Sequence, residues 1–80
     1  MDKKTIELIA VGASAAANCR PCMDYHFAAG RKLGVSDEDL HGALEVGIRV
    51  NQGAGKKTVD YIREHLGQNV SGERKKGCCG

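Results

Sequence analysis

The stretch that decides the fold, residues 3–22, reads KKTIELIAVGASAAANCRPC. Its apolar residues recur at intervals of three and four, which predicts a helix over residues 3–17. The residues that share one face of this helix are Ile6, Ile9, Ala10, Ala13 and Ala17. Residues 12–17 are all small, so we expect a neighbouring helix to approach closely there. Pro21 interrupts the helix and suits the first turn of a second one, where its missing N–H costs nothing.

Helix signals continue after the proline. The second helix is expected to run to about Leu33, because Gly34 follows it and glycine is the usual residue beyond a helix end. Ser36 is a good N-cap and acidic residues fill the next turn, which predicts the start of a third helix. The apolar residues of this helix cover more than one narrow stripe, so we expect one side to face another subunit.

The end of the chain divides into a last helix and a tail. The Gly-Ala-Gly segment at 53–55 is expected to break the third helix, and a last helix over about 55–66 to end at Gly67. Residues 68–80 are polar, basic and rich in glycine, which indicates a tail after a domain over residues 1–67. No strand-like alternation or hairpin turn is present, so we predict an all-α fold.

The composition of the chain argues against several classes of function. Eighty residues allow one small domain, and 41% hydrophobic with 28% charged residues suits a folded chain. A net charge of +2 and only 4% aromatic residues argue against a nucleic-acid partner. No stretch is apolar enough to span a membrane and the N-terminus lacks a signal peptide, so we expect a cytoplasmic protein. Because so short a helical chain has a thin core, we expect a homo-oligomer; the alternative is a weakly stable monomer.

The four cysteines form two close pairs, Cys19/Cys22 and Cys78/Cys79. In a protein without an export signal, such pairs are more often redox-active or metal-binding than structural. Two cysteines three residues apart at a helix start close a disulfide with little chain movement. The helix N-terminus also favours the thiolate, which is the nucleophile in disulfide exchange. His26 lies one helical turn after Cys22, where it is placed to move a proton.

Glu7 is the only acid inside the apolar part of the first helix. Its carboxylate faces either solvent or a site. If it faces inward, it is placed to orient His26 and accept its proton.

Glu7 followed by Cys19-x-x-Cys22 and His26 resembles the signature of the AhpD-like (alkylhydroperoxidase D-like) branch of the carboxymuconolactone decarboxylase superfamily. The resemblance extends over roughly residues 5–65. It implies an all-α fold that assembles into trimers or hexamers. Pro21 departs from AhpD, which has a histidine there, and the decarboxylase branch lacks the cysteine pair, so lactone decarboxylation is not assigned.

The same resemblance implies an enzyme that reduces disulfides or peroxides. Cys19 and Cys22 would cycle between dithiol and disulfide, with Glu7 and His26 as their proton relay. The implied partners are a thiol or disulfide electron-donor protein and a disulfide or peroxide substrate. No cofactor is expected in this reaction.

A metal site is the first alternative. Zinc would take Cys19, Cys22 and His26, with a fourth ligand from Cys78, Cys79, His41 or His65. An iron–sulfur cluster would take Cys19, Cys22, Cys78 and Cys79. Against both sites, a second cysteine pair on a flexible, glycine-rich tail would lose conformational entropy on becoming ordered. Attachment of c-type haem is excluded, because Met23 stands where that signature needs a histidine.

Two further hypotheses remain open. A non-enzymatic helical assembly protein would use its cysteines only as small buried residues. Cys78 and Cys79 would, in the redox hypothesis, form an arm that relays reducing equivalents to the first pair; binding a metal, or no role at all, are the other interpretations.

Overall fold

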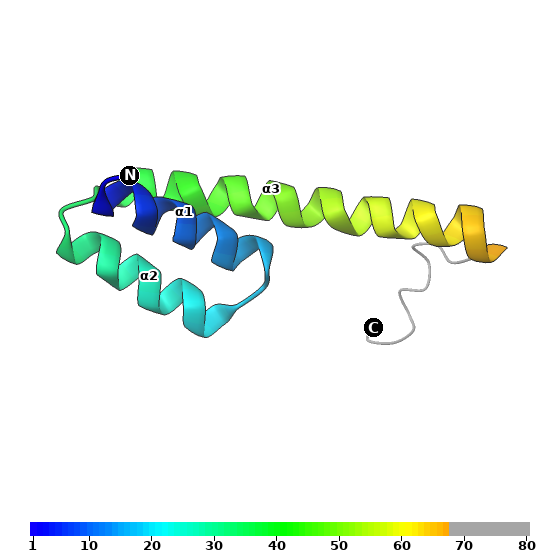
Figure 1. The fold of residues 1–80 in the computed structure, drawn as a ribbon, viewed down its shortest axis with the longest axis horizontal. Helices are drawn as coiled ribbons and strands as arrows, with labels where there is room; N and C mark the ends of the chain where they lie inside the picture. The colour runs from blue at the N-terminus through cyan, green and yellow to red at the C-terminus, as the bar shows by residue number, and fades with distance from the viewer. Residues whose placement is uncertain (68–80) are drawn as a thin grey trace.

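The structure is a computed structural model that describes residues 1–67. Three α-helices, α1 (Lys3–Ala16), α2 (Arg20–Lys32) and α3 (Asp37–Ile62), are followed by one π-helical turn, η1 (Arg63–Gly67). Helix α1 lies between the other two, packing on α2 and on the first half of α3, while the second half of α3 extends past them (Figure 1). No strand occurs in the described part of the chain, and the all-α prediction is confirmed.

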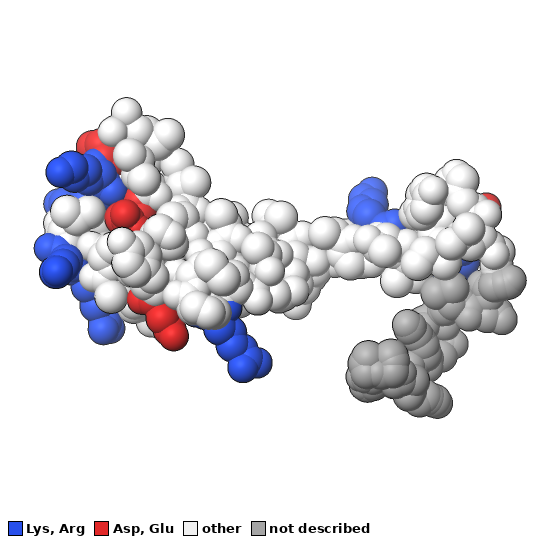
Figure 2. All heavy atoms as spheres, turned by 60° about the horizontal axis from the view of Figure 1, so that its bottom comes forward, with Lys and Arg blue, Asp and Glu red and all other residues white. Residues whose placement is uncertain are grey.

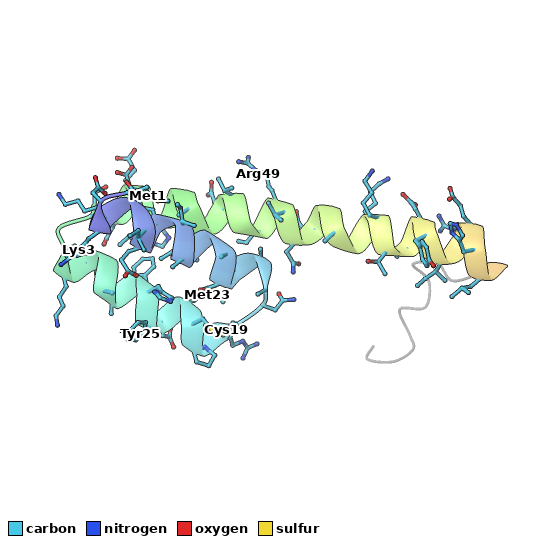
Figure 3. The ribbon with its side chains drawn as sticks, in the orientation of Figure 1. Met1, Lys3, Cys19, Met23, Tyr25 and Arg49 are labelled. Atoms are coloured by element: carbon cyan, nitrogen blue, oxygen red, sulfur yellow. A yellow bond between two sulfur atoms is a disulfide. The ribbon has the colours of Figure 1, made fainter. Side chains whose placement is uncertain are left out.

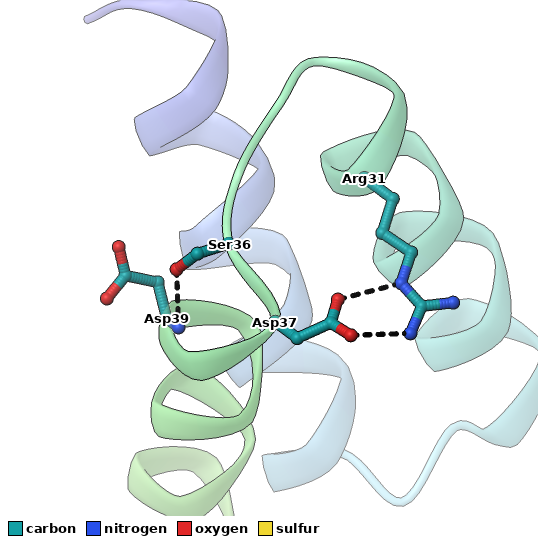
Figure 4. Close-up of polar contacts among 4 residues, drawn as sticks. All are labelled: Arg31, Ser36, Asp37 and Asp39. Carbon is teal, nitrogen blue, oxygen red and sulfur yellow. Dashed lines mark hydrogen bonds and ion pairs between the residues drawn. The ribbon is translucent and has the colours of Figure 1, made fainter.

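The helix starts follow from capping side chains. Asp2 caps α1 by accepting a hydrogen bond from the Thr5 N–H at 2.8 Å, and this bond lowers the pKa of the Asp2 carboxyl. Ser36 caps α3 as predicted, accepting the Asp39 N–H at 3.1 Å (Figure 4). The acidic first turn of α3 adds favourable charge at its positive end.

The turns that follow α1 and α2 have the same backbone motif. After α1, the N–H groups of Asn18 and Cys19 donate to the carbonyls of Ala15 and Ser14, and Asn18 has φ +58°. After α2, Gly34 takes the corresponding place with φ +90° and ends the helix as expected. Left-handed residues at this position turn the chain sharply, so α1, α2 and α3 run back and forth beside one another.

The core is small and centred on α1. Val11 and Leu40 are fully buried, and Ala15 and Val35 nearly so. Leu8, Phe27, Ala43 and Leu44 pack against this cluster while remaining partly exposed. The apolar face expected from the spacing in α1 is therefore not the buried one: Ile6 and Ile9 are 46% and 53% exposed.

Helices α1 and α3 come closest where two glycines face each other. A Cβ atom at Gly47 would overlap the carbonyl oxygen of Gly12 and the side chain of Ala15. This confirms the expected close approach at the run of small residues. The contact ends at Asn51, whose amide Nδ2 donates to the Ala16 carbonyl at 2.8 Å.

The predicted break at residues 53–55 is wrong, and the separate helix over 55–66 with it. Helix α3 continues through this segment to Ile62. Each helical glycine costs about 1 kcal/mol relative to alanine, which weakens the helix without ending it when no proline or left-handed residue follows. Gly67, where the last helix was expected to end, has φ +68° and is the last residue that the structure describes. None of the helices within residues 1–67 is long and apolar enough to cross a membrane.

Candidate redox site

The cysteine pair lies at the start of α2, where Cys19 and Cys22 form a disulfide with their Cα atoms 5.2 Å apart. Cys19 is the N-cap of the helix, and its Sγ accepts the N–H of Cys22 at 3.2 Å. Pro21 occupies the first turn, as predicted. The arrangement places the sulfur of Cys19 against unpaired N–H groups of the helix, an environment that stabilises negative charge.

The position of Cys19 is set by the end of α1. Its N–H donates to the Ser14 carbonyl at 2.9 Å, across the left-handed turn at Asn18. Sequence reasoning missed Asn18. The signal was present, because asparagine directly after a run of alanines is the residue that most often replaces glycine beyond a helix end.

A contact between His26 and Glu7 joins α2 to α1, with His26 one helical turn after Cys22 in α2. The Nδ1 atom of His26 and the Oε1 atom of Glu7 are 2.8 Å apart, and the side chains are 31% and 20% exposed. Of the two orientations open to Glu7, the structure has the one that faces α2. With Nδ1–H donating to the carboxylate, the Nε2 atom of His26 remains free to exchange a proton with another group.

The outer side of the site is open and partly apolar. The Tyr25 ring meets the His26 ring edge-on, with centroids 4.9 Å apart, and Tyr25 is 68% exposed. Tyr25 also lines a shallow hollow of about 600 Å³ on α2, together with Lys32 and Leu33. Figure 3 shows Cys19, Met23 and Tyr25 along this helix. The hollow borders the site at Tyr25, and neither the cysteine pair nor the His26–Glu7 pair lines it.

The metal alternatives gain no support from residues 1–67. No three His, Cys, Asp or Glu side chains in this range are grouped so that they could hold a metal ion. His41 packs edge-on against Phe27, and His65 stacks on Tyr61 at the far end of the long helix. Cys78 and Cys79, with the predicted tail over 68–80, lie outside the described residues.

Comparison with known proteins gives one match. The sequence model of the carboxymuconolactone decarboxylase family matches residues 1–59. No curated protein and no solved structure matches the chain.

Proposed function

Because the chain belongs to the carboxymuconolactone decarboxylase family, we propose that it is a thiol-dependent oxidoreductase of the AhpD-like branch, which reduces disulfides or peroxides. One observation carries the proposal: a Cys19–Cys22 disulfide begins the same helix that holds a His26–Glu7 hydrogen bond. A nucleophile pair, a proton carrier and a group that orients the carrier are what dithiol chemistry needs.

The proposed cycle has a reductive half. A thiolate of an electron-donor protein attacks one sulfur of the Cys19–Cys22 disulfide and forms a mixed disulfide, and the other cysteine leaves as a thiolate. A second donor thiol then displaces the enzyme sulfur. The donor leaves oxidised, and the enzyme holds two thiols after taking up two electrons and two protons.

In the oxidative half, an enzyme thiolate attacks a peroxide oxygen. The alcohol leaves, and the attacking cysteine becomes a sulfenic acid. The second cysteine attacks that sulfur, water leaves and the disulfide re-forms. Reduction of a disulfide substrate follows the same route through a mixed disulfide. Both routes use sulfur alone, so the proposal includes no metal or cofactor.

The two cysteines have different roles in this proposal. Cys19 caps the helix at its exposed end and is the sulfur that exchanges with partner proteins. Cys22 lies one turn before His26, so its proton passes to His26, and Cys22 attacks peroxide. Glu7 holds the imidazole in one tautomer and balances its charge after protonation.

The test is a single turnover: the protein is reduced with dithiothreitol, separated from it, and mixed with an aromatic disulfide or with cumene hydroperoxide, and re-formation of the Cys19–Cys22 disulfide is followed. Cys19→Ser and Cys22→Ser should each abolish turnover, since one thiol cannot re-form the disulfide. His26→Ala should slow it by about 100-fold, as expected for loss of a general acid–base group. Glu7→Gln should slow it less, because glutamine still accepts the imidazole N–H.

His41→Ala is the matched control and should leave the rate unchanged, because His41 contacts Phe27 rather than the disulfide. Full activity in the Cys22→Ser protein contradicts the dithiol mechanism. Stoichiometric zinc or iron in protein purified without oxygen, with its thiols masked, contradicts the metal-free cycle.

A further inference from the structure

The hollow beside the candidate redox site runs along one side of α2, and we call it the α2 hollow. Its volume of about 600 Å³ is in the range of sites that bind small molecules. All of its lining residues belong to α2 or to its C-cap; they are Tyr25, Ala28, Ala29, Lys32 and Leu33. Four of the five are aliphatic or aromatic, and Tyr25 and Leu33 expose 68% and 37% of their surfaces. Helix α2 therefore has an apolar surface that begins next to the cysteine pair.

Cys22 lies just beyond the Tyr25 end of the α2 hollow. Residues three and four apart are neighbours on a helix surface, so Tyr25 and His26 flank Cys22 one turn further along α2. At 100° per residue, Cys22, Ala29 and Lys32 fall within about 80° of one another around the helix. A ligand that lies along the hollow therefore has one end next to Cys22 and the imidazole of His26.

The other end of the α2 hollow carries a positive charge. Lys32 is exposed, and it forms no ion pair with any residue of the described range 1–67. Its neighbour Arg31 is bound to Asp37 through two hydrogen bonds. On the face shown in Figure 2, Lys and Arg side chains gather at the left end of the molecule, where α2 ends. An anionic group is favoured there, and Lys32 is the lining residue that can bind it.

The spacing of these features describes a ligand. Cys22 and Lys32 are ten residues apart, which is about 15 Å along the helix. The surface between them is apolar, and it has the ammonium group of Lys32 at one end and a thiol of the proposed cycle at the other. A molecule that matches all three parts has a reducible group, an aliphatic chain and a carboxylate, in that order.

We propose that the α2 hollow binds the hydroperoxide of a long-chain carboxylic acid, with its carboxylate at Lys32 and its peroxide at Cys22. The aliphatic chain lies over Tyr25 and Ala29 and is removed from water there. This inference rests on the proposed function and deepens it, because it names the class of peroxide that the site reduces.

The reaction follows the oxidative half of the proposed cycle. The Cys22 thiolate attacks the outer peroxide oxygen, the O–O bond breaks, and the alkoxide takes a proton from His26 and leaves as a hydroxy acid. Sulfur supplies the two electrons, so Cys22 becomes a sulfenic acid. The Cys19 thiol then attacks that sulfur, water leaves and the disulfide re-forms.

The test compares the hydroperoxide of linoleic acid with the same hydroperoxide as its methyl ester. The full chain is reduced, separated from the reductant and mixed with either compound, below the concentration at which it forms micelles. Re-formation of the Cys19–Cys22 disulfide is followed. The acid should react about five-fold faster than the ester, as expected for one exposed ion pair. Equal rates, or a faster ester, overturn the inference.

Substitutions in the α2 hollow test the assignment to Lys32. Lys32→Gln should reduce the acid-to-ester ratio of rates to about one, and Ala28→Glu should lower it by adding a negative charge to the exposed lining. Lys57→Gln is the matched control, because it removes the same charge from the second half of α3 and should keep the ratio of the unchanged protein. A Lys32→Gln protein that keeps its preference for the acid contradicts the inference.

The ratio also separates this role from a structural one. Lys32 is a basic residue in the last turn of α2, where it complements the negative end of the helix. Loss of that role changes the helicity measured by circular dichroism and slows both compounds alike, without changing their ratio.

The outcomes distinguish this inference from the proposed function. If both hydroperoxides re-form the disulfide at one rate, the proposed function stands and the inference fails. If an aromatic disulfide reacts and neither hydroperoxide does, the chain is a disulfide reductase and the inference fails as well. If none of the three compounds re-forms the disulfide, both proposals fail.

Discussion

The two halves of α3 are stabilised in different ways. In the first half, Leu40 and Gly47 are buried against α1, and the Ser36 cap sets the start. In the second half, a Cβ atom at Gly53 or Gly55 would have no neighbour within 4 Å. Local hydrogen bonds keep both halves helical, but among residues 1–67 the contacts with α1 and α2 fix only the first half. A substitution in the first half therefore tests the packing of the fold, whereas one in the second half tests helix propensity alone.

Alanine substitutions at two glycines, one in each half of α3, should show the difference between the halves most strongly. Gly47→Ala forces α1 and α3 apart and should lower the free energy of unfolding by about 3 kcal/mol. At Gly53 an added Cβ atom would have no neighbour within 4 Å. Gly53→Ala should therefore raise the free energy of unfolding by about 1 kcal/mol, because alanine favours the helix. Urea unfolding followed by circular dichroism measures both. Equal effects at the two positions would show that the halves do not differ.

The turn before the cysteine pair offers the next largest effect. Asn18→Ala places a side chain with no polar group at φ +58° and should cost about 1–2 kcal/mol of unfolding free energy. Asn18→Gly is the control and should be close to neutral, since glycine adopts this conformation freely. The same urea titration measures both variants. A neutral Asn18→Ala would mean that the turn after α1 is not left-handed in solution.

The smallest expected effect comes from removing a charge at the start of α3. Arg31 binds Asp37 through two hydrogen bonds of 2.8 and 2.9 Å (Figure 4), and this lowers the pKa of the Asp37 carboxyl. A carboxyl whose pKa falls on folding stabilises the protein above its unfolded pKa, and this is lost as pH falls through the folded pKa. Asp37→Asn should therefore lower the melting temperature slightly at pH 7 and leave it unchanged near pH 2.

Asp60→Asn is the matched control in the second half of α3. Asp60 lies 3.8 Å from Lys56 and 4.0 Å from Arg63, contacts longer than a hydrogen bond. Its replacement should change the melting temperature less than Asp37→Asn at pH 7. The opposite order would contradict the stronger coupling assigned to Arg31 and Asp37.

Sequence patterns predicted the start of α3 and the end of α2 well because single residues determine them. Ser36 and Gly34 act through their own hydrogen bonds and backbone conformation, and both behave as expected. The predicted helix break at Gly53 and Gly55 is wrong, because glycine weakens a helix without ending it. The buried face of α1 was also not predictable, since this helix is apolar on two sides and the partner decides which side is covered.

The candidate site depended on more than local pattern. Glu7 and His26 are 19 residues apart, and only the packing of α1 on α2 brings them to 2.8 Å. Periodicity left Glu7 facing either solvent or the site. The family resemblance, rather than the spacing of apolar residues, supplied the pairing. Their roles in catalysis stay a prediction until the variants are assayed.

The capping sulfur of Cys19 gives the first turn of α2 a dependence on oxidation state. The atom that accepts the Cys22 N–H is also one of the two atoms that the proposed reaction converts from disulfide to thiol. Each proposed cycle therefore alternates the acceptor at the beginning of the helix between a disulfide sulfur and a thiolate, which accepts the N–H more strongly, so the strength of the cap changes with the chemistry. For an inactive protein that keeps its shape, serine is the replacement to choose at this position, because its hydroxyl oxygen still caps the helix, whereas alanine would remove the chemistry and the cap together.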